Sequence, residues 1–276
     1  MREGPHLGPR APRDSRLGEP VKEPTVTPQH TVLLVGGTGR TGGRVLTQLL
    51  ERGVAVRVIV RSAARLPGGV AGNPLLSVVE ADPLSLTTEA LRCHLEGCDT
   101  VVSCLGHNLT VKGIFGPPFD LVARAASSLA YAVEAMQPTS PVHFVLMSSV
   151  SVNRPAKADA RRGTFERLLL ALLRGLVPPA RDNQRAADFF TREIGPSSRA
   201  VEWVVVRPDT LLDGDVTEYR LSGELVSSIF HPDETNMANV AHFICELTTD
   251  EHTWKRWQGG MPVIVNARTT PSRREG

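Results

Sequence analysis

TVLLVGGTGRTG, residues 31–42, is the stretch that decides the fold of this 276-residue chain. Its first five residues form a continuous run of β-branched and aliphatic side chains, which is typical of a strand buried on both faces of a parallel sheet. Glycines follow at once, and residues 44–52 then place apolar side chains at helical spacing before Gly53, a residue type that commonly ends a helix. The stretch predicts a buried strand, a tight glycine turn and a helix.

The same alternation of strand and helix continues along the chain. Short β-branched runs predict strands at 55–60, 76–80, 100–104, 143–147 and 201–206, and helical patterns occupy 86–95 and 120–136. A helical stretch at 165–192 is interrupted by Pro178-Pro179, which predicts two helices separated by a rigid turn near a substrate pocket. The whole pattern predicts an α/β protein with a Rossmann-like, doubly wound and mainly parallel sheet.

The ends of the chain differ from this regular middle. Residues 1–30 hold six prolines and three glycines but little apolar surface, so we expect a flexible leader. Residues 209–265 lose the regular alternation and contain one helical pattern at 236–247 and a short apolar run at 262–265. We interpret them as a small substrate-side cap within one domain that spans 31–265, followed by a polar tail at 266–276.

The composition narrows the partners that we expect. Apolar residues make up 41% of the chain, and 31 basic side chains nearly balance 29 acidic ones. The sequence contains no basic stretch with interleaved aromatic residues, so we do not expect nucleic-acid binding. No apolar run approaches the ~20 residues that a membrane span requires. The four cysteines (93, 98, 104 and 245) lack zinc-site spacing, so we expect no metal and a reducing compartment. We expect a cytoplasmic protein, with an organelle matrix as the alternative.

The glycine turn has a known physical use. Its first glycine, Gly36, permits the tight turn, Gly39 lets the backbone approach a pyrophosphate, and Gly42 allows the helix to pack closely on the strand. The free N–H groups and the positive end of the helix then favour an anion. We therefore predict a dinucleotide site formed by Gly36, Gly37, Thr38, Gly39, Arg40, Thr41 and Gly42. The alternative is a tight turn that binds no ligand.

The second predicted strand indicates which dinucleotide binds. NAD sites usually carry an acid about 20 residues beyond the glycine turn, on the ribose hydroxyls. Here the strand ends at Arg61, with no carboxylate at its tip. Arg61 is suited to a bidentate contact with a 2′-phosphate, and Arg40 is suited to reach the same group from the other side. These residues favour NADP, with NAD as the alternative. Each arginine has a second interpretation, that of a solvated surface side chain that contacts no cofactor.

Polar and small residues follow the later strands. Because ligands of open α/β sheets bind outside the carboxyl ends of the strands, we expect these residues to converge. Asp82 is placed to accept a hydrogen bond from an adenine amino group, and Leu105 and Gly106 are placed beside the ribose. His107, Ser148 and Ser149 lie where a nicotinamide and its substrate are expected. For the two serines the alternative is simple satisfaction of a strand end.

Taken together, these motifs resemble a known family. GGTGRTGG, VRSAAR, the acid at Asp82, LMSSVS and EWVVVRPDTLLDG look like those of the atypical short-chain dehydrogenases, and most of all like their NAD(P)-binding, NmrA-like branch. The resemblance covers residues 31–265. It implies a Rossmann-like sheet, a bound dinucleotide and a substrate cleft roofed by the C-terminal part. It also implies that Arg207-Pro208 begins the turn toward the substrate side.

The chain departs from ordinary members of that family at the catalytic pair. The usual Tyr-x-x-x-Lys is absent, since neither Tyr131 nor Tyr219 has a lysine four residues later. At the expected place the chain reads RDNQRAAD, residues 181–188, which resembles the Asp-(His/Asn) variant of NmrA-like relatives. Asp182 and Asn183 are therefore candidates to contact cofactor or substrate, or else to cap the helix running to Phe190.

Two functions remain open from the sequence. The first is an NADPH-dependent reductase of a small carbonyl, quinone or conjugated acceptor, with Ser148, Ser149 and His107 as catalytic candidates. The second is a catalytically silent module in which NADP occupancy tunes contact with a protein partner. The nearly complete cofactor site favours the first, and the missing tyrosine–lysine pair favours the second.

Overall fold

The computed structural model describes residues 30–107, 117–154, 163–228 and 230–267. Its centre is an eight-stranded sheet with the order β3-β2-β1-β4-β5-β6-β10-β8, in which only the last pair is antiparallel. The strands are β1 (Thr31–Val35), β2 (Ala55–Val60), β3 (Leu76–Glu80), β4 (Thr100–Ser103), β5 (Val142–Met147), β6 (Val201–Pro208), β8 (Tyr219–Ser222) and β10 (Val263–Asn266). The predicted Rossmann-like, doubly wound α/β fold is confirmed, with the 3-2-1-4-5-6 order of dinucleotide-binding sheets.

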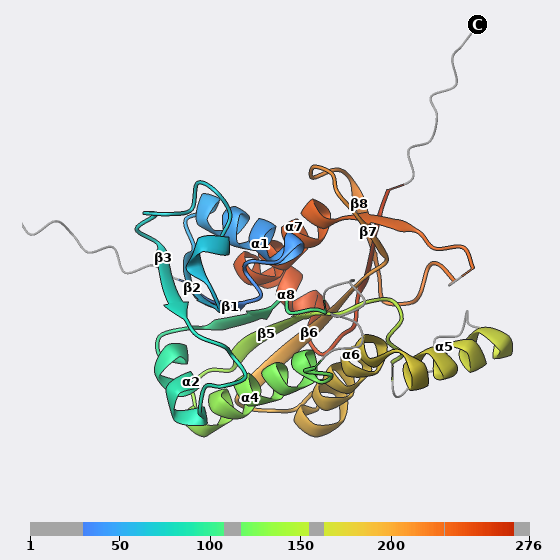
Figure 1. Cartoon of the computed structure of the whole chain (residues 1–276), viewed down its shortest axis with the longest axis horizontal. Helices are drawn as coiled ribbons and strands as arrows, with labels where there is room; N and C mark the ends of the chain where they lie inside the picture. Colours follow the sequence, from blue (N-terminus) through green and yellow to red (C-terminus); the bar gives the residue numbers. More distant parts are fainter. Residues whose placement is uncertain (1–29, 108–116, 155–162, 229, 268–276) are drawn as a thin grey trace, which may run out of the picture.

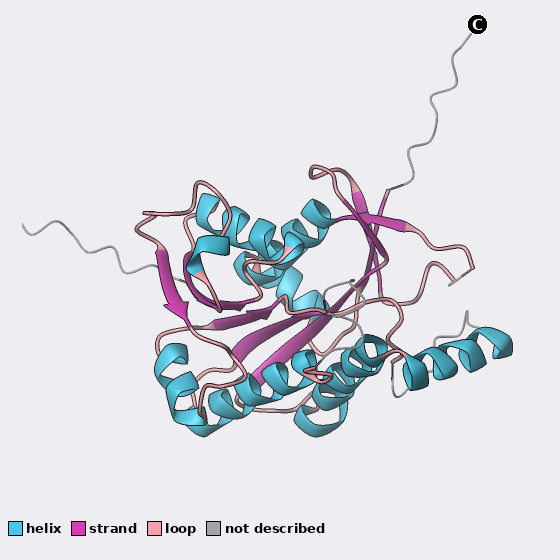
Figure 2. Cartoon of the chain, in the orientation of Figure 1, coloured by secondary structure: helices cyan, strands magenta, loops and turns pink. Residues whose placement is uncertain are grey.

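Helices cover both faces of the sheet (Figures 1 and 2). On one face lie α1 (Arg40–Glu51), α7 (Met237–Thr249) and α8 (Glu251–Trp257), and on the other lie α2 (Thr88–Leu95), α4 (Leu121–Met136) and α6 (Pro178–Asp188). A hydrophobic core lies on each face of the sheet, and alternate residues of β1 contribute to the two cores. Val32 and Leu34 pack toward α1 and α7, whereas Leu33 and Val35 pack toward α4. This explains why the run TVLLV contains no outward polar position.

Two helices begin at different residues from those predicted. The helix predicted at 44–52 begins four residues earlier, at Arg40, because Gly39 is already its N-cap. The helix predicted at 86–95 begins at Thr88, because the Thr87 hydroxyl accepts a hydrogen bond from the Ala90 N–H at 3.2 Å. Such capping by threonine fixes the first helical residue.

The stretch around Pro178-Pro179 forms two helices, as predicted. Helix α5 (Thr164–Leu176) ends before the prolines, and α6 begins at Pro178, where a missing N–H is tolerated. A π-helical stretch, Phe189–Ile194, continues α6 and buries Phe190 against the core.

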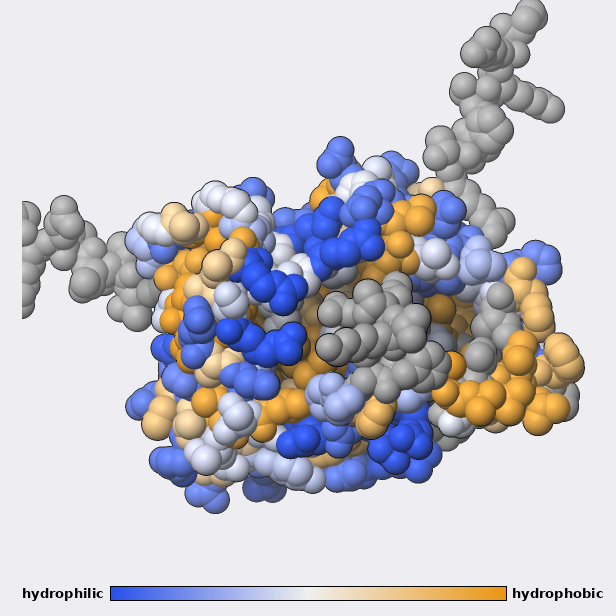
Figure 3. Space-filling model, in the orientation of Figure 1, coloured by the Kyte–Doolittle hydropathy of each residue, from blue (hydrophilic) through white to orange (hydrophobic). Residues whose placement is uncertain are grey.

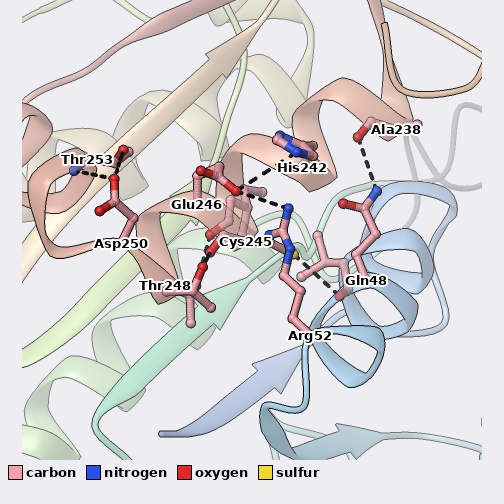
Figure 4. Close-up of polar contacts among 12 residues, drawn as sticks. Gln48, Arg52, Ala238, His242, Cys245, Glu246, Thr248, Asp250 and Thr253 are labelled. Atoms are coloured by element: carbon pink, nitrogen blue, oxygen red, sulfur yellow. Dashed lines mark hydrogen bonds and ion pairs between the residues drawn. The ribbon is translucent and has the colours of Figure 1, made fainter.

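Residues 209–267 are joined to the main sheet and to α1. Strands β8 and β10 extend the sheet, while β7 (Thr210–Leu212) and β9 (Glu234–Asn236) pair separately in parallel. Figure 4 shows the contact between α1 and α7, where Arg52 binds Glu246 at 3.1 Å and Gln48 donates to the Ala238 carbonyl at 3.3 Å. Helix α8 and strands β7, β8 and β9 were not predicted.

The predicted leader at 1–30 lies outside the described residues except for its last residue, and most of the predicted tail also lies outside them. Of the described helices, none combines the length and the apolar character that crossing a bilayer requires.

Candidate functional site

The glycine turn is held by close backbone contacts. Gly36 has a φ of +83°, and a Cβ atom there would lie 2.5 Å from the carbonyl carbon of Cys104 at the end of β4. At Gly42 a Cβ would lie 2.2 Å from the Gly36 carbonyl oxygen. The turn is thus pressed against β4, and α1 is pressed against the turn. This geometry fits the roles predicted for the first and third glycines.

The N-terminus of α1 is left without a capping side chain. Its N-cap is Gly39, which has none, and the first turn contains no acidic residue. The Gly39 N–H instead donates to the Gly36 carbonyl at 2.9 Å, which closes the turn. The first-turn N–H groups of a helix have no intrahelical acceptor, and the helix dipole is positive at this end. The arrangement fits a phosphate group.

A cavity of about 240 Å³ opens where the carboxyl ends of β1, β2, β3 and β4 meet. It brings together eight of the predicted residues: Gly36, Thr38, Gly39, Arg61, Asp82, Leu105, Gly106 and His107. The rest of its wall consists of Arg65, Leu84, Cys104, Leu121 and the prolines 83, 117 and 118. The remaining predicted residues do not line it: Gly37, Arg40, Thr41, Gly42, Ser148, Ser149, Asp182 and Asn183. Thus the ends of β1 to β4 converge as expected, and the two serines after β5 lie outside this wall.

Arg61 and Arg65 stand at the edge of this cavity with exposed side chains. Within the part of the chain that the structure describes, neither guanidinium forms an ion pair or a hydrogen bond. The Glu80 carboxylate also lies at this edge and was not predicted from the sequence. It comes from β3, where Glu80 pairs with Val60, and one of its oxygens accepts the Ala63 N–H at 2.8 Å. An acid therefore reaches the tip of β2 from the neighbouring strand, a position that the sequence of β2 alone does not indicate.

Arg40 is engaged elsewhere in this structure. Its guanidinium contacts Asp213 at 2.5 Å, and Arg44 contacts the other oxygen of the same carboxylate at 3.1 Å. Arg40 and Arg44 border a second, open hollow of about 860 Å³ between α1 and α7, which shares Thr38, Gly39 and Arg65 with the first cavity. Asp213 was not predicted, because it is 173 residues from Arg40 in the sequence.

Asp82 lines the cavity but is partly engaged. One carboxylate oxygen accepts the Leu84 N–H at 3.0 Å and so forms a local turn after β3. The side chain is exposed. The hydrogen bond of the turn uses only one of the two oxygens, so the other is available for the predicted contact with an adenine amino group.

His107 and Asp182 form a buried pair. Their side chains are 6% and 0% exposed, and His107 Nε2 lies 2.8 Å from an Asp182 oxygen. The same carboxylate accepts the N–H groups of Val122 at 2.8 Å and Ala123 at 3.0 Å. A carboxylate only accepts hydrogen bonds, so the nitrogen that faces Asp182, Nε2, carries a proton. The other ring nitrogen, Nδ1, makes no hydrogen bond to Asp182. His107 therefore presents a fixed ring to the cavity wall.

The position of Asp182 corrects one of the two alternatives drawn from the sequence, because its carboxylate caps α4 and not its own helix, α6. Asp182 does not line the cavity itself but contacts the cavity residue His107, so a role beside the cofactor stays a prediction. The physical reason is that Asp120, the N-cap residue of α4, makes no side-chain capping bond, so a neighbouring helix supplies the acceptor. Asn183 follows it as a half-buried residue of α6.

The two serines after β5 differ from each other. Ser148 is 7% exposed, and its hydroxyl oxygen is buried without a hydrogen-bond partner among the described residues. Ser149 accepts the Ser151 N–H at 3.0 Å and shares a hydroxyl contact with Ser151 at 2.9 Å. Ser149 is therefore a turn-forming residue here, whereas the Ser148 hydroxyl is a buried polar atom that lacks a partner.

Arg207 and the two tyrosines have structural hydrogen bonds away from the cavity. The buried Arg207 guanidinium donates to the backbone carbonyls of Met261 at 2.9 Å and Val152 at 3.3 Å, so it fixes the end of β6. The Tyr131 hydroxyl donates to Glu193 at 3.0 Å, and the Tyr219 hydroxyl lies 3.0 Å from His242 on α7. Neither tyrosine lines the cavity.

A family model described as NAD(P)H-binding matches residues 36–251, which includes the glycine turn, the cavity and α7. The chain belongs to this NAD(P)H-binding family. The resemblance drawn from the motifs is confirmed at this level, and the nicotinamide dinucleotide is the ligand class of the site. The uncapped helix end and the glycine cradle fit that ligand.

Individual proteins are also similar to this chain. An uncharacterized chloroplastic protein of Arabidopsis thaliana is 30% identical over 65% of this chain and 59% of its own length. The averufin oxidase stcO of Emericella nidulans is 27% identical over 68% of this chain and 65% of its own length. The chain thus spans less than two thirds of each. The solved structure of the oxidoreductase ylbE of Lactococcus lactis matches with a TM-score of 0.63 and 19% identity, over 87% of this chain and 92% of that one.

Proposed function

We propose that this protein is an NADP(H)-dependent reductase that acts on a small carbonyl, quinone or conjugated acceptor. The observation that carries the proposal is the pair of unpaired arginines, Arg61 and Arg65, at the edge of the cavity beyond β2. Exposed arginines at this distance from the glycine turn are suited to the 2′-phosphate that distinguishes NADP from NAD.

The neighbouring acid does not oppose this assignment. An acid selects NAD when its oxygens are available to the ribose hydroxyls. One oxygen of Glu80 is already bound to the N–H of Ala63, a residue that lies between Arg61 and Arg65 in the sequence. A phosphate of about −2 charge gains two charge-assisted contacts from these arginines.

The chemistry expected at the site is reduction. When bound, the nicotinamide supplies a hydride, and the protein positions it and delivers a proton. His107 is the candidate acid in its imidazolium form, because its ring lines the cavity and Asp182 holds the Nε2–H, so that the Nδ1–H would be the proton that passes to the substrate. Ser148 is a candidate hydrogen-bond donor, because its buried hydroxyl has no partner among the described residues. The name of one curated relative, averufin oxidase, supports redox chemistry.

Cofactor choice is tested by calorimetric titration with NADPH and NADH. We expect the unaltered protein to bind NADPH more tightly, and Arg61→Ala/Arg65→Ala to weaken NADPH binding by about 10- to 100-fold with little effect on NADH. Arg92→Ala is the matched control, because Arg92 is paired with Glu89 on α2 and lies outside the cavity wall. Equal affinity for the two dinucleotides in the unaltered protein would contradict the NADP assignment.

Turnover is tested separately, by following NADPH oxidation with quinones, flavins and aldehydes. We expect at least one of these acceptors to be reduced, and His107→Ala to lower kcat by about 100-fold, as loss of a proton donor does. Turnover that survives this substitution unchanged would remove His107 from the mechanism. Tight NADPH binding without reduction of any acceptor would instead favour the alternative, a silent NADP-sensing module with a protein partner.

A further inference from the structure

Helix α5 (Thr164–Leu176) carries a row of exposed apolar side chains. Phe165, Leu168, Leu172 and Leu176 are 70%, 68%, 56% and 64% exposed. Their spacing of three and four residues places them on one face of the helix. In Figure 1 α5 projects from the end of the molecule, and Figure 3 shows a protruding apolar surface there. Contiguous apolar surface of this kind marks a contact site.

This exposed face is not the face that packs on the protein. Leu170 and Glu166 point the other way, at 3% and 5% exposure, and α5 packs against α6. At one end of the row, Phe230 from the loop after β8 stacks on Phe165, with ring centroids 6.1 Å apart, and is itself 54% exposed. Two separate segments thus contribute to one apolar surface, which we call the α5 surface (Phe165, Leu168, Leu172, Leu176 and Phe230).

The described charges beside α5 are basic. Arg181 and Arg185 are exposed on α6, the helix that packs against α5. Of the acids on these two helices, Glu166 and Asp182 are buried, and Asp188 is half-buried and accepts a hydrogen bond from the Gln184 amide. A helix that combines an apolar face with a basic setting is typical of proteins that bind an anionic membrane surface.

We propose that the α5 surface binds the surface of an anionic phospholipid bilayer, with α5 lying in the membrane plane. A helix of 13 residues is shorter than the ~20 that a span requires, so it lies on the bilayer rather than across it. The apolar row enters the boundary between headgroups and acyl chains, and the arginines attract anionic lipids. The sequence-based expectation of no membrane partner considered only spanning segments.

A second copy of the chain fits this surface less well. A two-fold contact places the same patch of both subunits together, so the basic stretch of one copy would face the basic stretch of the other. The α5 surface also stands out from the body as a ridge (Figure 3), which suits insertion into a deformable lipid interface.

The test is flotation of the full-length protein with vesicles of phosphatidylcholine alone or with about one third phosphatidylserine. We expect binding to the anionic vesicles, weakening in high salt, and little binding to the neutral ones. The variant Leu168→Gln/Leu172→Gln should bind the anionic vesicles about tenfold more weakly, because each leucine loses its apolar contact with lipid. Val78→Gln/Val216→Gln is the matched control, since both valines are exposed, at 41% and 47%, on other parts of the surface.

The outcomes separate the proposal from its alternatives. Circular dichroism and NADPH titration show whether each variant keeps its fold and its cofactor site, so a loss of lipid binding alone supports the α5 surface. Failure of the unaltered protein to float with anionic vesicles overturns the proposal, as does equal flotation of both double variants. Concentration-dependent dimers that Leu168→Gln/Leu172→Gln disperses would assign the surface to a second copy, and would overturn it as well.

Discussion

Substitution of Gly42 by alanine tests the geometry of the glycine turn most directly. An added Cβ would lie 2.2 Å from the Gly36 carbonyl oxygen, 2.9 Å from the carbonyl carbon and 3.0 Å from Cys104 Cβ. Contacts below 3.0 Å essentially do not occur for real Cβ atoms. Two of these three neighbours are backbone atoms of the turn, so α1 must move away from it, and no side-chain rotation relieves the contact.

The expected cost follows from two opposing terms. Forcing an extra carbon into a packed site costs about 1–3 kcal/mol, and more where backbone must shift. Alanine in a helix interior recovers about 1 kcal/mol relative to glycine. Since the contact must open from 2.2 Å to at least 3.0 Å against backbone, we place the overpacking at the upper end of its range. The net loss in the free energy of unfolding is then about 2 kcal/mol.

Gly43 provides a control at the next position of the same helix. A Cβ there would lie 3.0 Å from Pro67 Cγ, a side-chain atom, and 3.4 Å from the Gly37 carbonyl oxygen. The helix propensity gain is the same as at Gly42, but the obstacle is one proline ring that can shift by a few tenths of an ångström. We therefore expect Gly43→Ala to change the free energy of unfolding by less than about 1 kcal/mol in either direction.

Thermal unfolding with and without NADPH measures both effects. We expect Gly42→Ala to lower the Tm by about 4–8 °C and to lose most of the stabilisation by NADPH, because the displaced turn misplaces the phosphate donors. Gly43→Ala should keep the Tm within a few degrees and retain the NADPH effect. If the two variants have the same Tm, or if Gly42→Ala is stabilised by NADPH as fully as the unaltered protein, the close packing of turn and helix does not govern the site.

Three further predictions concern single acidic or titratable residues. Asp213→Asn should tighten NADPH binding by about two- to fivefold in calorimetry, because it frees two arginines from an exposed ion pair, whereas Asp215→Asn should not. Asp182→Ala should lower the free energy of unfolding in urea by about 1–3 kcal/mol, because two N–H groups of α4 lose their acceptor; unchanged stability would refute this cap. Burial lowers the pKa of His143, so as pH falls below about 6.5 the unfolded chain takes up the proton first and the folded protein loses stability. His143→Phe, followed by Tm from pH 7 to 5, should lose less over this window, and an identical loss would contradict the assignment.

The cofactor half of the fold was predictable because its signals are local. The run TVLLV, the glycines after it and the apolar spacing of α1 lie within 21 consecutive residues, and each signal constrains the next. The convergence of Arg61, Asp82 and Gly106 needed one general rule, that parallel strands end at the same edge of a sheet. Short-range pattern and one topological rule thus suffice for most of the cavity wall.

The parts that escaped prediction depend on distant neighbours. Glu80 reaches the tip of β2 only because β3 pairs with β2 in a particular register, with Glu80 opposite Val60. The Asp182 carboxylate caps a helix whose first turn is 60 residues earlier, and no local rule connects the two. Strand β8 lacks a strong pattern of its own, and its position is set by antiparallel pairing with β10. In each case tertiary packing, rather than local propensity, chooses the partner.

Two long-range contacts connect the C-terminal half of the chain to the start of a helix in the cofactor half. Asp182 and Asp213 both belong to the C-terminal half, and each holds the N-terminal turn of a helix in the cofactor half, α4 and α1 respectively. A dinucleotide phosphate at the start of α1 would meet Asp213 near the same arginines, and like charges there repel. Asp182 connects the start of α4 to His107 in the cavity wall, so a displacement of α6 would turn the ring that we expect to deliver a proton. We therefore predict that the C-terminal half influences both the affinity for the cofactor and the orientation of the His107 ring, although it contributes none of the residues that line the cavity.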